Sequence, residues 1–188
     1  NITGPLPKGV YAKDVILSII GRIGVNGATN KVIEFTGPVV DDMSMEARMT
    51  LCNMAAELGA QTGIIEPDET TAAYVTAAGG EPGDWQAFRS DTDAKYKITH
   101  EFEAADLAPQ VAAPHSPANA ADVNEVEPAE IDQFYIGACT GAKLNDLKMA
   151  ASILKGKSVA NGKRLTIAPA SSRILTQATK DGIIEILL

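Results

Sequence analysis

An asparagine and a glutamate four residues apart, with one distant cysteine, are the residues of this chain with the clearest potential for chemistry. Asn53 and Glu57 lie in the run Met45–Gly59, and Cys139 follows roughly eighty residues later. Residues at i and i+4 of an α-helix share a face, so an amide and a carboxylate at this spacing can reach one small ligand. The spacing therefore indicates that both side chains can reach the same small ligand.

Cys139 directly follows the strand-like run Phe134–Ile136 and precedes a predicted helix. Backbone N–H groups and the positive end of a helix stabilise a thiolate, the form that binds metal or attacks carbon. No C-x-x-C pair is present, and a 4Fe-4S cluster takes several thiolates, so the residues alone do not predict a cluster. A thiol-dependent enzyme is a further alternative, for which His115 is the only candidate base, and a weak one.

Two stripes run along the predicted helix that carries Asn53. The apolar stripe predicts that Cys52 is a small core residue; its members are Met45, Met49, Cys52 and Ala56. The polar stripe is also what a solvated helix face would look like; its members are Glu46, Thr50, Asn53 and Glu57.

Composition narrows the class of protein. A net charge of -8 argues against a nucleic-acid or anionic membrane surface, because phosphates require a positive patch. No apolar run reaches the roughly 18 residues that cross a bilayer, and the first residues do not form a signal peptide. Two cysteines do not form a disulfide framework, so we expect the cytoplasm as the compartment. His100 and His115 lack the spacing of zinc ligands.

The hydrophobic pattern alternates between helical and strand-like runs, which predicts an α/β fold with parallel or mixed sheets flanked by helices. The predicted helices are 13–23, 45–58, one starting near Pro67, 144–154 and one after Ser172. The predicted strands are 32–35, 63–65, 134–136 and 165–168. Functional sites in such folds lie at the carboxyl ends of the strands, which is where Cys139 falls.

A change of composition between Ala104 and Glu130, with four of the ten prolines, predicts a division into two lobes. We expect a first α/β lobe at 1–103 with the Asn53 and Glu57 helix. Residues 104–130 form a Pro/Ala-rich crossing segment, and 131–188 form a second, incomplete lobe with Cys139. The apolar end Ile183–Leu188 suggests a piece of a longer chain.

Five segments in this order resemble the aconitase superfamily of iron-sulfur hydro-lyases and, within it, the 3-isopropylmalate dehydratase large-subunit family. The segments are Ala12–Leu17, Ile33–Gly37, Ser44–Met54, Pro67–Thr71 and Ile136–Thr140. The resemblance implies an aconitase-like fold and an enzyme that isomerises 2- and 3-isopropylmalate in leucine biosynthesis by dehydration and rehydration. It implies a hydroxy-dicarboxylic acid substrate and a small swivelling-domain subunit as partner.

The resemblance also assigns roles to residues. It implies that Asn53 and Glu57 are catalytic and act around the substrate hydroxyl or water, and that Cys139 is the first of three thiolates holding a 4Fe-4S cluster. The family's other motifs are absent from this chain: upstream histidine and aspartate motifs, a downstream C-x-x-C pair, and the small subunit's serine and arginines. The fragment alone is therefore expected neither to hold a stable cluster nor to turn over substrate.

The chain departs from the family pattern near Cys139. Where the family commonly has G-S-C-T-N-G-R, this chain has Gly137–Lys143, with Gly141 for the asparagine and Lys143 for the arginine. A lysine is a point charge and lacks the fork of donors of an arginine. Homoaconitase, aconitase and a dimethylmalate-type dehydratase remain alternative activities. A non-catalytic folded interaction module is the alternative of another class.

Overall fold

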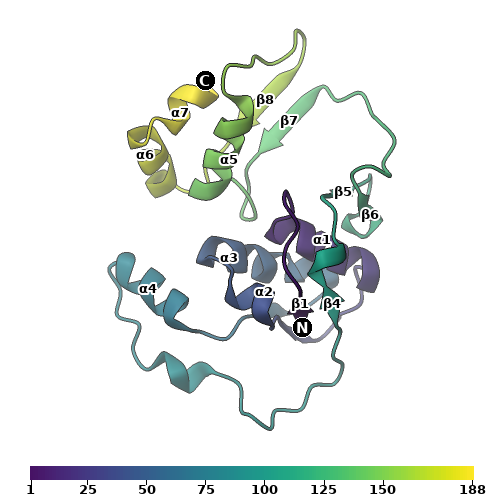
Figure 1. Ribbon diagram of the computed structural model, residues 1–188, viewed down its shortest axis with the longest axis vertical. Helices are drawn as coiled ribbons and strands as arrows, with labels where there is room; N and C mark the ends of the chain where they lie inside the picture. Colours follow the sequence, from purple (N-terminus) through teal and green to yellow (C-terminus); the bar gives the residue numbers. More distant parts are fainter. The chain divides into compact units, whose positions relative to one another are not determined.

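The computed structural model describes residues 1–188. The chain folds into two compact units, Asn1–Val126 and Glu127–Leu188, in which helices and short strands alternate (Figure 1). The α/β class predicted from the sequence is confirmed. None of the helices combines the length and the apolar content needed to cross a bilayer.

The first unit contains four α-helices, four short 3-10 helices and six short strands. In chain order they are β1 (Ile2–Thr3), α1 (Ala12–Ile23), β2 (Val32–Glu34), α2 (Pro38–Asp41), α3 (Met45–Asn53), η1 (Met54–Leu58), β3 (Thr62–Ile64), α4 (Glu69–Ala77), η2 (Trp85–Phe88), β4 (Phe102–Glu103), η3 (Ala104–Asp106), β5 (Gln110–Ala112), η4 (Pro117–Asn119) and β6 (Ala120–Asp122).

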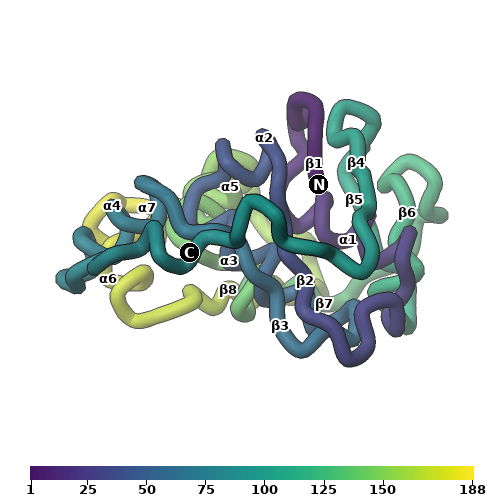
Figure 2. The backbone as a smooth tube through the Cα atoms, turned by 90° about the horizontal axis from the view of Figure 1, so that it is seen from below, coloured from purple at the N-terminus to yellow at the C-terminus, as the bar shows by residue number.

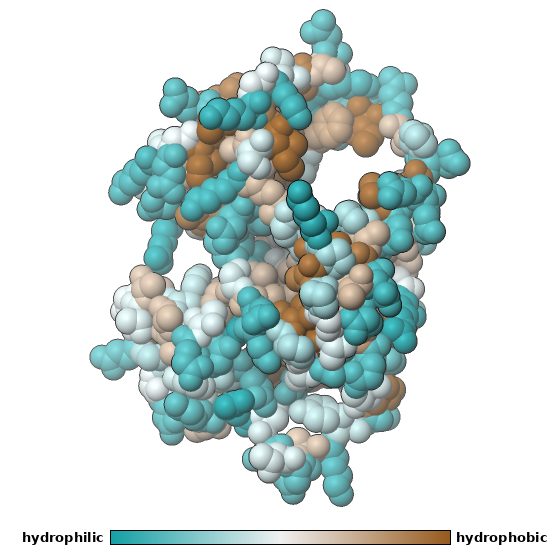
Figure 3. All heavy atoms as spheres, in the orientation of Figure 1, coloured by the Kyte–Doolittle hydropathy of each residue, from teal (hydrophilic) through white to brown (hydrophobic).

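The second unit contains a pair of strands and three helices. They are β7 (Gln133–Ile136), α5 (Leu144–Leu154), β8 (Arg164–Ile167), α6 (Ser172–Lys180) and α7 (Ile183–Leu187). The apolar run at the end of the chain forms the helix α7. Ile183 of α7 packs with Leu147 and Ala151 of α5. Figure 3 shows brown, hydrophobic surface over α5 and α7, where Ile153 and Ile186 are exposed.

The sheets are pairs of strands. Pairs β1–β4, β2–β3 and β7–β8 are parallel, and β5–β6 is antiparallel. Sequence reasoning found the strands of β2–β3 and β7–β8 within a residue or two. It missed the antiparallel pair, because Gln110–Asp122 is rich in alanine and proline and has no clear alternation.

Helix α1 is the centre of the first unit's core. Val15, Ile16, Ile19 and Ile20 are buried on one face of the helix, as its helical spacing predicted. The antiparallel pair β5–β6 also packs on α1. The first unit therefore includes much of the Pro/Ala-rich segment. The division into a first lobe at 1–103, a crossing segment at 104–130 and a second lobe at 131–188 stays a prediction.

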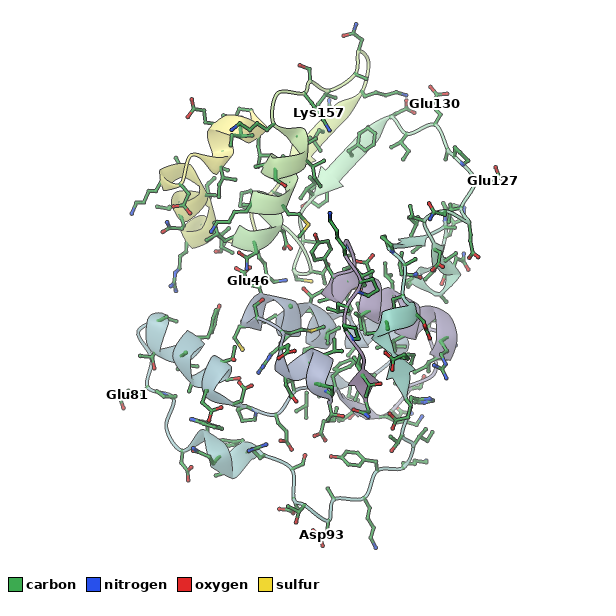
Figure 4. The ribbon with its side chains drawn as sticks, viewed as in Figure 1. Glu46, Glu81, Asp93, Glu127, Glu130 and Lys157 are labelled. Carbon is green, nitrogen blue, oxygen red and sulfur yellow. The ribbon has the colours of Figure 1, made fainter.

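An extended, exposed segment runs between α4 and β4 (Figure 2). Glu81 and Asp93 of this segment point outward (Figure 4). Two carboxylates near the ends of β2 and β3 hold it: Glu34 accepts from the Tyr96 hydroxyl at 2.7 Å, and Glu66 pairs with Arg89 at 3.1 Å. The backbone N–H of Ser90 also donates to Glu66 and is the largest cause of that carboxyl's lowered pKa.

Gly63, in the middle of β3, lets the strand lie directly against α3. A Cβ at Gly63 would lie 2.9 Å from Cα of Cys52 and 3.0 Å from Cβ of Ala55. Real Cβ atoms do not approach a backbone atom this closely, so a larger residue would force the strand and the helix apart.

Substitution Gly63→Ala is therefore expected to lower the free energy of unfolding by about 1–3 kcal/mol. Thr62→Ala, at the exposed preceding position in the same strand, is the matched control and should change it by less than about 0.5 kcal/mol. Urea unfolding followed by circular dichroism measures both. Equal midpoints for the two variants would contradict the close approach of β3 to α3.

Candidate functional site

Helix α3 begins at a good capping residue. The Ser44 side chain accepts a hydrogen bond from the N–H of Ala47 at 3.3 Å, which satisfies one of the helix's open donors. Glu46 lies in the first turn of the helix (Figure 4), where a carboxylate interacts favourably with the helix dipole. These local features explain why the helix starts at Met45, as the sequence predicted.

The buried face of this helix differs from the one predicted. Most of its buried residues recur with helical spacing and are Arg48, Leu51, Met54, Ala55 and Leu58. Thr50, which belongs to the polar stripe, is also buried. The stripe predicted to be apolar core is only half-buried at Met45, Met49 and Cys52 and is exposed at Ala56. The prediction failed because a charged residue, Arg48, occupies the core-facing row and makes that row look polar in the sequence.

The chain tightens after Asn53. The predicted single helix from 45 to 58 is an α-helix only to Asn53, and Met54–Leu58 is a 3-10 helix that ends at Gly59 with a left-handed φ of 78°. In an α-helix, residues four apart are rotated by about 40°. In a 3-10 helix the rotation is about 120°. The tightening therefore turns Glu57 away from the face on which the i, i+4 rule placed it with Asn53.

The two side chains accordingly have different surroundings. Asn53 is exposed, whereas Glu57 is half-buried. Atom Oε2 of Glu57 is buried and has no hydrogen-bond partner. Buried carboxylate oxygens are nearly always hydrogen-bonded in folded proteins, so this atom is expected to acquire a donor from a bound molecule. The structure thus places a carboxylate with an unfilled accepting position in the predicted site.

Cys139 lies in the second unit, in the loop between β7 and α5, where the sequence placed it. The side chain is exposed and forms no disulfide. Two non-glycine residues in this loop have left-handed backbone angles, Ala138 with a φ of 70° and Ala142 with a φ of 53°. A loop built on such angles is conformationally restricted, because they are costly for residues with a Cβ.

The loop around Cys139 is tied to its neighbours. Buried Ala142 accepts a hydrogen bond from the N–H of Ala170 at 3.0 Å. The Lys143 N–H donates to the Asp146 carboxylate at 3.0 Å at the start of α5. These contacts fix both the residue that leads into α5 and the turn that presents the Cys139 thiol.

Cys52 has a different character from Cys139. Partial burial raises the pKa of the Cys52 thiol, which disfavours the thiolate. No group of three or more His, Cys, Asp or Glu side chains in the chain lies close enough together to hold a metal ion. His100 packs against the Phe102 ring, with ring centroids 6.4 Å apart.

A buried ion pair that the sequence reasoning missed holds α3 to its neighbours. Arg48 is 3% exposed, and its two terminal nitrogens donate to the two carboxylate oxygens of Asp68 at 2.8 and 2.7 Å. The Arg48 Nε atom also donates to the carbonyl of Met43, at 3.0 Å, and one terminal nitrogen donates to that of Asp41, at 2.8 Å. Four hydrogen bonds thus hold the guanidinium, and they offset part of the cost of burying it.

Asp68 serves two elements at once. Besides binding Arg48, its carboxylate caps α4 by accepting from the N–H of Thr71 at 3.0 Å. The Arg48 hydrogen bond is the largest cause that lowers the pKa of Asp68 from 3.8 to about 2, and partial burial acts in the opposite direction. The sequence does contain one sign that Arg48 is buried: it falls on the same helical row as Leu51, Ala55 and Leu58.

Sequence comparisons show the family to which the chain belongs. The model of the aconitase family (aconitate hydratase) matches residues 1–188, and the chain belongs to this family. Among its relatives, the 3-isopropylmalate dehydratase large subunit 1 of Methanopyrus kandleri is 48% identical over 187 residues, which cover 100% of this chain and 44% of the relative. A probable 3-isopropylmalate dehydratase large subunit of Methanothermobacter thermautotrophicus is 47% identical over 188 residues.

The similarity extends to bacterial proteins. The 3-isopropylmalate dehydratase large subunit of Geobacter metallireducens is 45% identical over 199 residues, covering 100% of this chain and 46% of that protein. The chain therefore spans a little under half the length of the curated relatives that it matches.

The depressed pKa of Asp68 predicts a pH-dependent stability. The ionised carboxylate stabilises the fold above the ordinary pKa of 3.8, and this contribution is lost as the pH falls through the folded-state pKa of about 2. The shift corresponds to about 2 kcal/mol. Asp68→Asn keeps a capping side chain but removes the charge, so the variant should unfold at lower urea than the wild type at neutral pH.

The difference between the wild type and Asp68→Asn should shrink below a pH of about 4 and be small near the folded-state pKa of about 2, because the wild-type carboxyl is then protonated too. Urea midpoints measured across this range provide the test. Asp132→Asn, which removes an exposed partner of Lys163, is the control and should show little change. A difference that stays constant with pH would contradict the ion pair.

Proposed function

We propose that this chain is the central part of the large subunit of an iron-sulfur hydro-lyase that interconverts 2- and 3-isopropylmalate by removing and re-adding water, a step of leucine biosynthesis. The observation that carries the proposal is the buried, partnerless Oε2 of Glu57 on a chain that belongs to the aconitase family. The names of relatives at 45–48% identity support this substrate over the other hydroxy-acids of the superfamily.

Glu57 and Asn53 have complementary roles in this proposal. A hydroxyl leaves as water only if it gains a proton, and Glu57 is the titratable group placed to give one and later take it back. The Glu57 atom Oε2 has no donor from the protein, so a substrate hydroxyl or water can occupy that position. The Asn53 amide, at an exposed position, offers both a donor and an acceptor to the substrate or to water.

Cys139 is proposed as one of three thiolates that hold a 4Fe-4S cluster. Cys139 is an exposed thiol in a restricted loop after a parallel strand, which suits a cluster ligand. The chain has no group of three His, Cys, Asp or Glu side chains close enough to hold a metal ion, so the other ligands must come from elsewhere in the whole protein. When bound, the cluster supplies a Lewis-acid iron that polarises the substrate hydroxyl. The restricted angles at Ala138 and Ala142 keep the thiol presented before a cluster binds.

The proposal includes partners and a compartment. A hydroxy-dicarboxylic acid is the substrate, and a small swivelling-domain subunit completes the enzyme around two lobes of this large subunit. The name "large subunit" carried by the relatives supports such a partner. Two cysteines that form no disulfide are consistent with a reducing compartment, and we place the protein in the cytoplasm.

Glu57→Gln in the whole protein that carries this chain is expected to lower kcat at least about 100-fold, since the amide accepts a hydrogen bond but cannot transfer the proton. Cluster absorbance should be unchanged. Glu81→Gln, at an exposed carboxylate of the segment after α4, is the control and should retain activity. The steady-state rate of hydration of the unsaturated intermediate is measured for both variants. Near-normal turnover in Glu57→Gln would contradict the role of Glu57 in proton transfer.

The two cysteines allow a matched test of cluster binding. Cys139→Ser should lose iron, sulfide and the visible absorbance of the cluster, because an alcohol is a poor ligand for it. Cys52→Ser, at the half-buried thiol on α3, should keep all three. Metal analysis after anaerobic desalting of the whole protein gives the answer. A Cys139→Ser variant with a full iron content would rule out Cys139 as a ligand.

A further inference from the structure

The guanidinium of Arg48 is bonded to three segments around the helix that ends in Asn53. Its Nε atom binds the Met43 carbonyl just before α3, one terminal nitrogen binds the Asp41 carbonyl in α2, and both bind Asp68 at the start of α4. A planar group with donors in fixed directions sets orientation as well as position. Helix α3 therefore cannot turn about its axis without breaking several of these bonds.

The carboxylate on the other side is equally constrained. Asp68 accepts from Arg48 and from the N–H and hydroxyl of Thr71, at 3.0 and 3.4 Å. The Thr71 hydroxyl also lies 3.6 Å from the sulfur of Met45, the first residue of α3. The start of α4 is thus linked to α3 twice, through Asp68 to Arg48 and through Thr71 to Met45.

The Arg48 hydrogen bonds act on Asn53 and Glu57 through the short helix α3. Asn53 is five residues beyond Arg48, about 7–8 Å along the helix axis, and Glu57 follows in the next turn. Gly63 packs against Cα of Cys52 at the far end of the same helix. With both ends fixed, the direction of the two side chains depends on the Arg48 bonds.

We propose that Arg48 and Asp68 are positioning residues that set the orientation of Asn53 and Glu57, so that weakening the pair lowers turnover in a protein that remains folded. The inference rests on the proposed function only where the test measures kcat. The alternative is that the pair contributes to stability alone, as an ion pair elsewhere in the unit would.

Cys52 provides a reporter of helix position that does not depend on activity. It neighbours Asn53 on α3, and it is half-buried with a raised pKa, so its alkylation depends on local opening of the helix. In a Cys139→Ser background it is the only cysteine of this chain. Its alkylation rate therefore measures how firmly α3 is held.

The experiment compares Arg48→Lys and Asp68→Asn with Arg89→Lys, which alters the exposed pair with Glu66. In this 188-residue chain with Cys139→Ser, the first two variants should speed iodoacetamide labelling of Cys52 at least about tenfold, and the control should not. In the whole protein with Cys139 intact, kcat per bound cluster should fall about 10- to 100-fold with KM changed less than about threefold.

Each outcome decides the inference. Faster labelling with a lower kcat per cluster supports a positioning role, and rescue in Arg48→Lys by added guanidinium would strengthen it. Unchanged labelling, or faster labelling with a normal kcat per cluster, overturns it. If the wild-type protein shows no hydro-lyase activity, the proposed function fails, while the labelling rates still decide whether the pair holds α3.

Discussion

The buried ion pair between Arg48 and Asp68 is the interaction on which the arrangement of the first unit's site depends. Burying a guanidinium that is 3% exposed is costly unless it is paired and hydrogen-bonded, and here its partners are one carboxylate and two carbonyls. Those partners come from α2, from the turn before α3 and from the start of α4. Removing the Asp68 charge leaves the buried Arg48 guanidinium without its anionic partner, whereas Asp68 itself is 29% exposed. The pair therefore fixes which way α3 faces, and with it the direction of the residues at its end.

A second constraint acts where that helix ends. Gly63 allows β3 to touch the backbone at Cys52, and the chain then tightens into a 3-10 helix that carries Glu57. The tightening leaves Oε2 of Glu57 buried without a donor. An unsatisfied buried oxygen is unfavourable in the ligand-free fold, and it becomes satisfied when a hydroxyl or water binds. Stable packing around an unfavourable atom is the pattern expected of a site built to bind a small polar molecule.

The sequence predicted the elements better than it predicted the contacts. Periodicity located α1, α5 and the strands of the pairs β2–β3 and β7–β8, and Ser44 marked the start of α3. It missed the parallel pair β1–β4, whose strands are two residues long. The change to a 3-10 helix at Met54 could not be foreseen, since Met54–Leu58 contains no glycine or proline. Arg48 was missed because charge normally indicates solvent, and its partner Asp68 lies 20 residues away. The loop angles at Ala138 and Ala142 have no sequence signal, because alanine rarely adopts them.

The central proposal is that Glu57 moves a proton and that Cys139 holds a cluster iron, and a crystal structure of the whole protein, grown without oxygen and with the hydroxy-acid bound, tests both roles most directly. The account predicts that the Cys139 sulfur is bonded to a cluster iron and that Oε2 of Glu57 lies within hydrogen-bond distance of the substrate hydroxyl oxygen or of a water beside it. A bound substrate far from Glu57, or a cluster whose ligands exclude Cys139, would contradict the account.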